Sequence, residues 1–181
     1  ERASVLAVGP GLGVRGWGHA LWDRAVHGGK PMVLDADGLN LLASHASSDM
    51  QISVITPHPG EAARLLGCDV VEIQKDRFAS VRRLAEKFDC VAVLKGAGTL
   101  VADPRGQVAL CPFGNPGMAS AGMGDLLTGV IAGLLAQGMS PWDSACLGVL
   151  AHAVSGDRAA QGRPRGLLAS DLLLPLRDCV N

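Results

Sequence analysis

Short apolar segments alternate along this chain with longer segments that carry a helical period. Buried strands are predicted at residues 4–8, 32–34, 52–55 and 91–94. Residues 99–102 and 107–110 flank the turn sequence Asp-Pro-Arg-Gly, which is typical of a hairpin. This order of elements predicts an α/β fold, a mostly parallel central sheet covered by helices on both faces, with a late antiparallel hairpin.

Helical periods and capping residues place the helices between these strands. Apolar residues recur at helical spacing most clearly in residues 75–88, and one face of this helix carries Phe78, Val81, Leu84 and Phe88. The arginines of this helix, Arg77, Arg82 and Arg83, are expected to face solvent. Ser140 and Pro141 predict the start of a helix that runs to about residue 160, and Ser170 predicts the start of a last one. No linker or repeat divides the chain, so residues 1–181 are expected to form a single domain.

The glycine-rich segment 114–125 carries the strongest chemical signal, because an apolar helical run, 126–135, follows it at once. Gly122 and Gly124 let the backbone approach a ligand closely, and the first N–H groups of a helix, at the positive end of its dipole, favour a phosphate. Asp125 has two interpretations. It is either a base that takes a proton from a hydroxyl during phosphoryl transfer, or a residue that caps and charges the helix start.

A second glycine-rich loop follows the first predicted strand. Gly11, Gly13 and Gly16 satisfy the G-x-G-x-x-G pattern of dinucleotide-binding folds. Such a pattern arises readily in a chain with 24 glycines. We therefore favour the simpler interpretation, in which this loop approaches a ligand at the carboxyl edge of the sheet.

Polar residues end the second and third strands. Asp35, Asp37 and Asn40 are suited to bind a metal or substrate hydroxyls, but Asp37 is equally suited to cap the next helix, and the sequence leaves this open. His58 stands between two prolines that fix the backbone, so it is either a functional imidazole held at a set angle or a structural residue. Glu61 is expected to charge the first turn of a helix at 61–66.

Lys95 ends the fourth strand, in the sequence Lys-Gly-Ala-Gly-Thr. The segment is not a P-loop, which requires its lysine at a helix start, so nucleotide binding here needs another geometry. Lys95 could reach a phosphate or extend along the surface towards solvent. Since the carboxyl ends of parallel strands meet at one edge of a sheet, all these groups are expected to converge there.

Composition narrows the class of ligand. The 181 residues are 48% hydrophobic, with a net charge of -1 and no basic cluster, which argues against nucleic acid or a membrane surface and for a small molecule. The 3% aromatic content, without tyrosine, predicts a core of small aliphatic side chains. The five cysteines form no metal-binding spacing, so free thiols in a reducing cytoplasm are expected.

Together the motifs carry a resemblance to a known family. They are V-G-P-G-L-G at 8–13, D-A-D-G-L-N at 35–40, T-P-H-P-G-E at 56–61, K-G-A-G-T at 95–99 and G-N-P-G-M-A-S-A-G-M-G-D at 114–125. In this order and spacing they resemble the ADP- or ATP-dependent NAD(P)H-hydrate dehydratases, which belong to the ribokinase-like superfamily. The resemblance covers nearly the whole chain and implies a ribokinase-like three-layer αβα sandwich.

The resemblance also implies a reaction and a set of site residues. Family members phosphorylate the hydroxyl of hydrated NADH or NADPH with ADP or ATP and then eliminate phosphate, which repairs the dinucleotide. By resemblance, Gly11, His58 and Asp125 contact the hydrated dinucleotide, with Asp125 as the base, and the N–H groups of Gly122, Met123 and Gly124 form the anion hole. The nucleotide-binding residues implied are Lys95, Gly96, Ala97, Gly98, Thr99, Asn115, Pro116, Gly117, Met118, Ala119, Ser120, Ala121, Gly122, Met123 and Gly124.

Further expectations follow from the same resemblance. Mg²⁺ is expected with the nucleotide, and a cytoplasmic homo-oligomer, a tetramer, is expected, either fused to or paired with an epimerase domain. The chain begins without methionine, and the family's domain carries further strands and helices upstream, so residues 1–181 are expected to lack the amino-terminal part of that domain. The family often has Thr or Ser where Met123 stands; a role through the backbone N–H tolerates this change.

Three other functions compete with this one. A ribokinase-like kinase that makes a stable phosphate ester would share the Gly-Asp loop, although the segments around His58 and Lys95 argue against it. A nucleotide-binding fragment without catalysis is the second alternative. An oxidoreductase that binds a dinucleotide at Gly11 to Gly16 is the third.

Overall fold

The computed structural model describes residues 3–45 and 50–180. Its centre is a six-stranded sheet in the order β1-β2-β3-β4-β5-β6. The strands are β1 (Leu6–Val8), β2 (Met32–Leu34), β3 (Ile52–Ile55), β4 (Val91–Leu94), β5 (Thr99–Ala102) and β6 (Val108–Cys111). Strands β1 to β4 pair in parallel, and β5 is antiparallel to both β4 and β6. The predicted α/β class, the parallel sheet and the late hairpin are confirmed.

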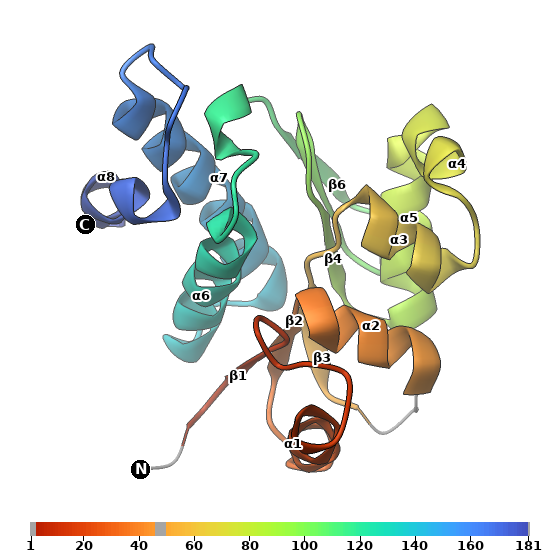
Figure 1. Ribbon diagram of the computed structural model, residues 1–181. Helices are drawn as coiled ribbons and strands as arrows, with labels where there is room; N and C mark the ends of the chain where they lie inside the picture. Colours follow the sequence, from red (N-terminus) through yellow and green to blue (C-terminus); the bar gives the residue numbers. More distant parts are fainter. Residues whose placement is uncertain (1–2, 46–49, 181) are drawn as a thin grey trace.

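Helices cover both faces of this sheet, which makes three layers (Figure 1). One face carries α1 (Trp17–Val26), α2 (Ala36–His45), α3 (Pro59–Leu66), α4 (Val70–Lys75) and α5 (Arg77–Phe88). The other face carries α6 (Met123–Ala136) and α7 (Pro141–Ala160). The short helices η1 (Pro116–Met118), η2 (Ala169–Leu172) and α8 (Leu173–Cys179) adjoin this second layer, where α8 packs on α7. No helix among residues 3–45 and 50–180 is both long enough and apolar enough to span a membrane.

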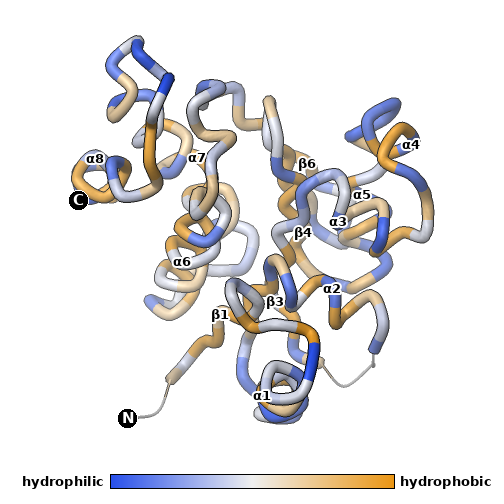
Figure 2. Tube along the Cα trace, viewed as in Figure 1, coloured by the Kyte–Doolittle hydropathy of each residue, from blue (hydrophilic) through white to orange (hydrophobic). Residues whose placement is uncertain are grey.

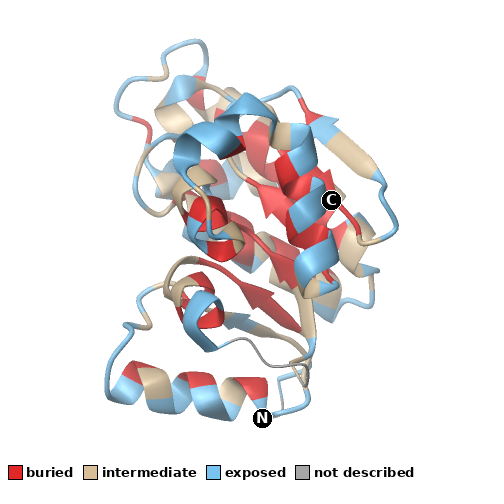
Figure 3. Ribbon diagram, turned by 90° about the vertical axis from the view of Figure 1, so that its right-hand side faces the viewer, coloured by how far each residue is buried: buried red, intermediate tan, exposed pale blue. Residues whose placement is uncertain are grey.

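Successive side chains of each central strand point to opposite faces of the sheet, so the hydrophobic core has two parts, one on each face. Met32 and Leu34 pack with the helices of the first layer, whereas Val33 between them packs with α6 and α7. The same alternation recurs in β4 and β5, since successive side chains of a strand point to opposite faces of the sheet. Figure 2 shows the resulting apolar strands, and Figure 3 shows them buried beneath helices whose outer faces are exposed.

The helix predicted at 75–88 begins two residues later than expected. Asp76 interrupts it, because the Asp76 carboxylate accepts a hydrogen bond from Ala79 N (2.9 Å) and so caps α5. Val81 and Leu84 are buried as predicted, but Phe78 is 45% exposed. Arg77 instead lies one turn before Val81 on the buried stripe of the helix, so its predicted position facing solvent is wrong.

The other boundaries differ only slightly from the predictions. Strand β6 begins at Val108 because Gln107 belongs to the preceding turn, where its N–H donates to the Asp103 carboxylate (2.8 Å). Helix α7 extends over the predicted span, with Ser140 as its cap. The five cysteines are free, and burial raises the pKa of Cys90 to about 12 and of Cys146 to about 11, so these thiols remain protonated.

One close backbone approach at the end of β1 requires glycine. Gly9 has a φ of 136°, and a Cβ placed on it would lie 1.7 Å from the carbonyl oxygen of Asp35. The reciprocal contact restricts Gly38, whose Cβ would lie 2.6 Å from the carbonyl of Val8. These glycines let the end of β1 lie directly against the start of α2.

We predict that Gly9→Ala lowers the free energy of unfolding by more than about 3 kcal/mol, because the added methyl forces the two backbones apart. Gly29→Ala is the matched control. Gly29 also has a positive φ, of 61°, but no atom lies within 4 Å of its Cβ position, so a cost of about 1–2 kcal/mol is expected. Urea unfolding measures both, and equal losses would contradict the steric explanation.

Candidate active site

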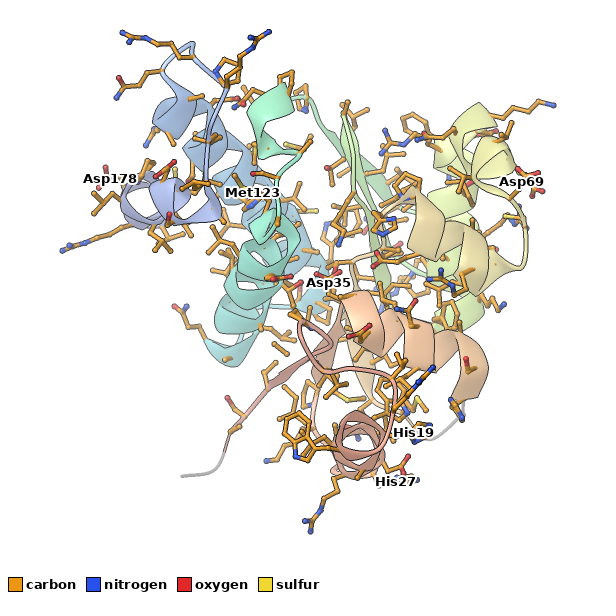
Figure 4. All side chains as sticks on the ribbon, in the orientation of Figure 1. His19, His27, Asp35, Asp69, Met123 and Asp178 are labelled. Atoms are coloured by element: carbon orange, nitrogen blue, oxygen red, sulfur yellow. The ribbon has the colours of Figure 1, made fainter. Side chains whose placement is uncertain are left out.

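The carboxyl ends of β1 to β4 meet at one edge of the sheet, as predicted. The first residues beyond β1, β2, β3 and β4 are Gly9, Asp35, Thr56 and Lys95. Figure 4 shows Asp35 in the middle of the molecule, between α6 and α2. The amino terminus of α6 reaches the same place, since a Cβ on Gly124 would lie 3.2 Å from Lys95 Nζ and 3.4 Å from Asp35 Oδ2.

A buried ion pair lies at the centre of this edge. Lys95 Nζ donates to Asp35 Oδ1 at 2.6 Å and lies 3.8 Å from Glu61 Oε2. The side chains of Lys95 and Asp35 are only 19% and 2% exposed. The other oxygen of Asp35 accepts a hydrogen bond from Thr128 Oγ1 of α6 at 2.9 Å. Lys95 is therefore fixed by carboxylates at the carboxyl edge, which excludes the alternative of a lysine extending into solvent.

The three polar residues after β2 have separate roles. Asp35 belongs to the ion pair, whereas Asp37 accepts a hydrogen bond from Gly13 N (2.9 Å) and another from the Asn40 side chain (3.3 Å). Asn40 also accepts a hydrogen bond from Arg64. Asp37 lies inside α2 and holds the glycine loop after β1, so it does not cap this helix. Binding of a metal or of substrate hydroxyls, the other interpretation, stays a prediction.

His58 caps helix α3. Its Nδ1 accepts hydrogen bonds from Gly60 N (3.0 Å) and Glu61 N (3.3 Å), and Glu61 Oε2 accepts one from His58 N (2.7 Å). This is a capping box with histidine in the place of serine or threonine. The His58 side chain remains 57% exposed, so its outer surface is available to a ligand. Glu61 was expected only to charge this helix, but it is buried beside Lys95.

The loop 95–99 is held by a residue that the sequence did not reveal. The Arg77 guanidinium donates to the carbonyl oxygens of Leu94 (3.2 Å), Lys95 (3.3 Å) and Ala97. Burial lowers the pKa of Arg77 from its ordinary value. Arginine suits this position because its rigid fork of donors can satisfy several carbonyls at once. Its location on the buried stripe of α5 was the only available signal.

A cavity of about 460 Å³ opens beside Lys95. It lies between the β4–β5 loop, the end of β6, η1 and the helices α6 and α7. Its lining includes most of the residues predicted to bind nucleotide: Lys95, Gly96, Ala97, Gly98, Thr99, Asn115, Pro116, Met118, Ala119, Met123 and Gly124.

The remaining predicted nucleotide residues shape the loop without lining the cavity. Gly117 packs against the carbonyl of Pro164, where a Cβ would lie at 2.1 Å, and Ser120 Oγ donates to Leu167 O (3.1 Å). Ala121 and Gly122 precede α6 outside the cavity lining. Asp157 of α7, a second residue missed at the sequence level, holds this loop by accepting hydrogen bonds from Gly114 N and the Asn115 side chain, both at 2.9 Å.

The amino terminus of α6 leaves backbone N–H groups without a partner among the described residues. Gly122 precedes the helix with a φ of 84°, and no side chain caps it. The N–H groups of Gly122 and Gly124 have no hydrogen-bond partner within the described residues, whereas Met123 N donates to Ser120 O at 3.4 Å. The Met123 side chain packs with Ala160 and Leu172, so this position contributes an apolar anchor as well as a backbone N–H.

Asp125 and Gly11 lie outside the cavity, as does His58. Asp125 is exposed on the first turn of α6, and its carboxylate has no hydrogen-bond or ion-pair partner in the part of the chain that the structure describes. Gly11 adopts a φ of 67° in an open loop. The two predicted sets of residues are thus separated, since the nucleotide set surrounds a cavity and the substrate set is exposed.

A dedicated metal cage is not part of this arrangement. No group of three or more His, Cys, Asp or Glu side chains is suited to hold a metal within residues 3–45 and 50–180. Asp35 and Glu61 supply the oxygen donors that Mg²⁺ prefers, but Lys95 lies between them and occupies the position that a cation would take. These residues fit Mg²⁺ only as an ion that arrives with phosphate oxygens as its main ligands.

This mostly parallel sheet, with an uncapped helix start above its carboxyl edge, has the ribokinase-like α/β fold. Its likeness to a ribokinase from Thermotoga maritima, at 15% identity and a TM-score of 0.61, concerns the fold alone. The family model for NAD(P)H-hydrate dehydratase matches residues 1–176, and the chain belongs to this family.

Individual relatives agree with this assignment. The chain is 50% identical over 182 residues to the bifunctional NAD(P)H-hydrate repair enzyme Nnr of Escherichia coli, with 100% of the chain and 35% of that protein covered. It is 41% identical to the ADP-dependent (S)-NAD(P)H-hydrate dehydratase of Neisseria meningitidis, with 94% of the chain and 60% of that protein covered. The chain therefore spans only about a third to three fifths of the length of these relatives.

Among solved structures, the ADP/ATP-dependent NAD(P)H-hydrate dehydratase of Bacillus subtilis, co-crystallised with ATP and Mg²⁺, matches with a TM-score of 0.87. The two are 32% identical, and the match covers 98% of this chain and 64% of that one.

We predict that Asp35→Asn lowers the free energy of unfolding by about 2–4 kcal/mol, because it leaves Lys95 with only the more distant Glu61 as a counter-charge. Glu72→Gln is the matched control. It breaks the Arg83–Glu72 ion pair, whose length of 2.7 Å is similar but whose side chains are 47% and 52% exposed, so little or no change is expected. Chemical denaturation tests this, and equal effects of the two variants would contradict a special role for the buried pair.

Proposed function

We propose that this chain catalyses the ADP- or ATP-dependent dehydration of hydrated NADH and NADPH. One observation carries the proposal: Lys95 and the uncapped start of α6 meet at the wall of one cavity, with Asp125 on the first turn of the same helix. The unpaired N–H groups at a helix start favour a phosphate, the Lys95 ammonium is a further hydrogen-bond donor beside them, and the adjacent carboxylate is suited to accept a proton. Membership of the family and the names of the relatives support the same reaction.

In the proposed first step, a phosphoryl group passes from the nucleotide to the hydroxyl of the hydrated ring. The hydroxyl oxygen forms a bond to the terminal phosphorus, the bond from that phosphorus to the nucleotide breaks, and Asp125 takes the hydroxyl proton. Lys95 and the N–H groups at Gly122, Met123 and Gly124 stabilise the negative charge on the phosphoryl oxygens. The protein contributes position and charge neutralisation rather than a covalent bond.

In the second step, the new phosphate leaves. The carbon–oxygen bond breaks, phosphate departs with the electron pair, and loss of a proton from the neighbouring ring carbon restores the double bond of the dihydronicotinamide. Phosphorylation serves to convert hydroxide, a poor leaving group, into a good one. Mg²⁺ would neutralise phosphate charge when it is bound with the nucleotide.

The positions of the residues support two adjoining subsites. The residues that line the cavity and would hold the nucleotide are Lys95 to Thr99, Asn115, Pro116, Met118, Ala119, Met123 and Gly124, while Gly117, Ser120 and Ala121 keep the loop in shape. Gly11, His58 and Asp125 would contact the hydrated dinucleotide outside it. Assembly into a tetramer, association with an epimerase domain and further strands upstream of residue 1 stay predictions from the family resemblance.

An assay of hydrated NADH with ADP, with ATP and without nucleotide tests the proposal. Recovery of the near-ultraviolet absorbance of NADH, together with release of phosphate, is expected only when a nucleotide is present. A stable phosphate ester without recovery of NADH would instead identify a small-molecule kinase. Nucleotide binding without turnover, in a protein extended upstream, would contradict catalysis altogether.

We predict that Asp125→Asn abolishes turnover and leaves the ADP affinity unchanged or higher. Asparagine cannot accept the hydroxyl proton, and loss of the negative charge removes repulsion with the phosphates. Single-turnover kinetics and calorimetric binding of ADP measure the two effects separately. Near-normal turnover in this variant would refute the role of Asp125 as the base.

We predict that His58→Asn retains the stability of the protein but lowers kcat/KM for the hydrated dinucleotide about tenfold, as expected when one hydrogen bond is lost. Asparagine is a good helix cap, so α3 keeps its start, whereas the imidazole is removed. His58→Ala, which removes the cap as well, is expected to cost about 1 kcal/mol of stability in addition. Full activity of His58→Asn would show that His58 is a cap and nothing more.

A further inference from the structure

An arginine lies behind the loop between β4 and β5, and the proposed reaction gives it no role. Arg77 extends from α5 in the first helical layer, whereas the cavity is bounded by α6 and α7 on the other side of the sheet (Figure 1). The Arg77 guanidinium donates hydrogen bonds to the carbonyl oxygens of Leu94, Lys95 and Ala97. The loop lines the cavity and Arg77 does not, so the loop lies between this cation and the cavity.

The three hydrogen bonds fix the directions of three peptide groups. Each of these peptides is trans, so its N–H points away from its carbonyl and therefore away from Arg77. The first of the three N–H groups, that of Lys95, donates to Pro57 O at 2.9 Å. The other two belong to Gly96 and Gly98. Both glycines line the cavity, and neither N–H has a hydrogen-bond partner among the described residues.

The loop therefore presents hydrogen-bond donors to the cavity, and its acceptors are already occupied. The one carbonyl between residues 94 and 97 that Arg77 does not bind, that of Gly96, accepts a hydrogen bond from the Thr99 hydroxyl at 3.0 Å. A cation behind the carbonyls polarises the peptide groups and strengthens their N–H groups as donors. Within the described ranges, no carboxylate forms an ion pair with Arg77. Such a loop favours an anion with acceptor oxygens, and a phosphate is one.

Gly96 permits the close approach of the guanidinium to the loop. It has a φ of 138°, and a Cβ placed on it would lie 3.2 Å from Arg77 Nη2. A residue with a side chain would strain the backbone here and press against the guanidinium. Arginine is equally specific, because a planar fork of donors can bind several carbonyls at once and a lysine ammonium cannot do so in the same geometry.

We propose that Arg77 is a positioning residue of the nucleotide site, which directs the N–H groups of Gly96 and Gly98 towards phosphate oxygens of the nucleotide. This inference rests on the nucleotide site of the proposed function. Arg77 acts through the peptide groups of the loop and contacts neither the cavity nor a reacting atom. Its effect is therefore expected on the binding of phosphate-containing ligands.

Amide resonances of the wild-type chain test the directions of the N–H groups without any variant. In protein with isotope-labelled glycine, inorganic pyrophosphate and ADP are each expected to move the Gly96 and Gly98 amide protons downfield, as a new hydrogen bond does. Adenosine, which has no phosphate, is expected to cause no such shift. Gly67 and Gly106 are internal controls, because their N–H groups donate to backbone carbonyls outside the cavity.

Arg77→Ala tests what holds the N–H groups in place. This variant is expected to bind both pyrophosphate and ADP about tenfold more weakly in calorimetry, the effect of about one lost hydrogen bond, and to lose the downfield shifts of Gly96 and Gly98. Guanidinium ions, at a concentration far below that which unfolds proteins, are expected to restore the affinity by occupying the space that the side chain leaves. A role in stability alone would leave the affinity of the folded variant unchanged.

Arg83→Ala is the matched control variant. Arg83 lies on the same helix but pairs with Glu72 and not with the loop. This variant is expected to bind pyrophosphate and ADP as the wild type does, with or without guanidinium ions. Thermal unfolding of both variants confirms that they fold.

Several outcomes would overturn the inference. Unchanged affinity of folded Arg77→Ala would do so, as would a loss of affinity that guanidinium ions do not reverse. Downfield shifts with adenosine but not with pyrophosphate would show that the loop meets the base or sugar. If Arg77→Ala does not fold, the amide shifts of the wild type decide. Failure of the wild type to bind ADP would refute the nucleotide site itself, whereas ADP binding that leaves Gly96 and Gly98 unshifted would refute only the role of Arg77.

Discussion

The ion pair between Lys95 and Asp35 joins the parts of the molecule that form the site. Asp35 ends β2, Lys95 ends β4, and Glu61 reaches them from α3 across β3. Thr128 adds a hydrogen bond from α6 to the same carboxylate. One buried cation is thus shared by both helical layers and by the edge of the sheet between them. Since removal of one member of such a group leaves the others uncompensated, the position of Lys95 depends on all of these elements.

The same cation determines the electrostatics of the cavity. Lys95 Nζ lies close to Gly124, at the positive end of α6, so two positive features would repel each other unless carboxylates balanced them from behind. Asp35 and Glu61 supply this balance and are themselves buried. Asp125 has no such partner among the described residues and is exposed outside the cavity. In the proposed mechanism, this separation leaves one carboxylate free to accept a proton while a phosphate is held nearby.

The strands and their order could be predicted because each strand is a short apolar run bounded by turn residues. The convergence of Asp35, His58 and Lys95 at one edge followed from that order alone. Individual roles could not be predicted in the same way. Asp35 and Asp37 are two residues apart, yet one pairs with Lys95 and the other holds Gly13, and only the packing of the loop after β1 distinguishes them. Arg77 was expected to face solvent because the apolar residues of α5 are compatible with two buried faces. One of these faces begins at Phe78 and the other, which is the one observed, begins at Arg77.

Helix α7 shows most clearly why local patterns did not suffice. It contributes His152 and Asp157 to the site, but neither residue belongs to a recognisable motif. Both side chains reach the site because α7 packs closely against α6. Gly148 permits that approach, because a Cβ at this position would lie 2.7 Å from the side chain of Ile131. The close packing of α6 and α7 brings His152 to the cavity and Asp157 to the loop at Gly114 and Asn115. A glycine in the middle of a long helix thus positions two polar side chains that no motif identifies.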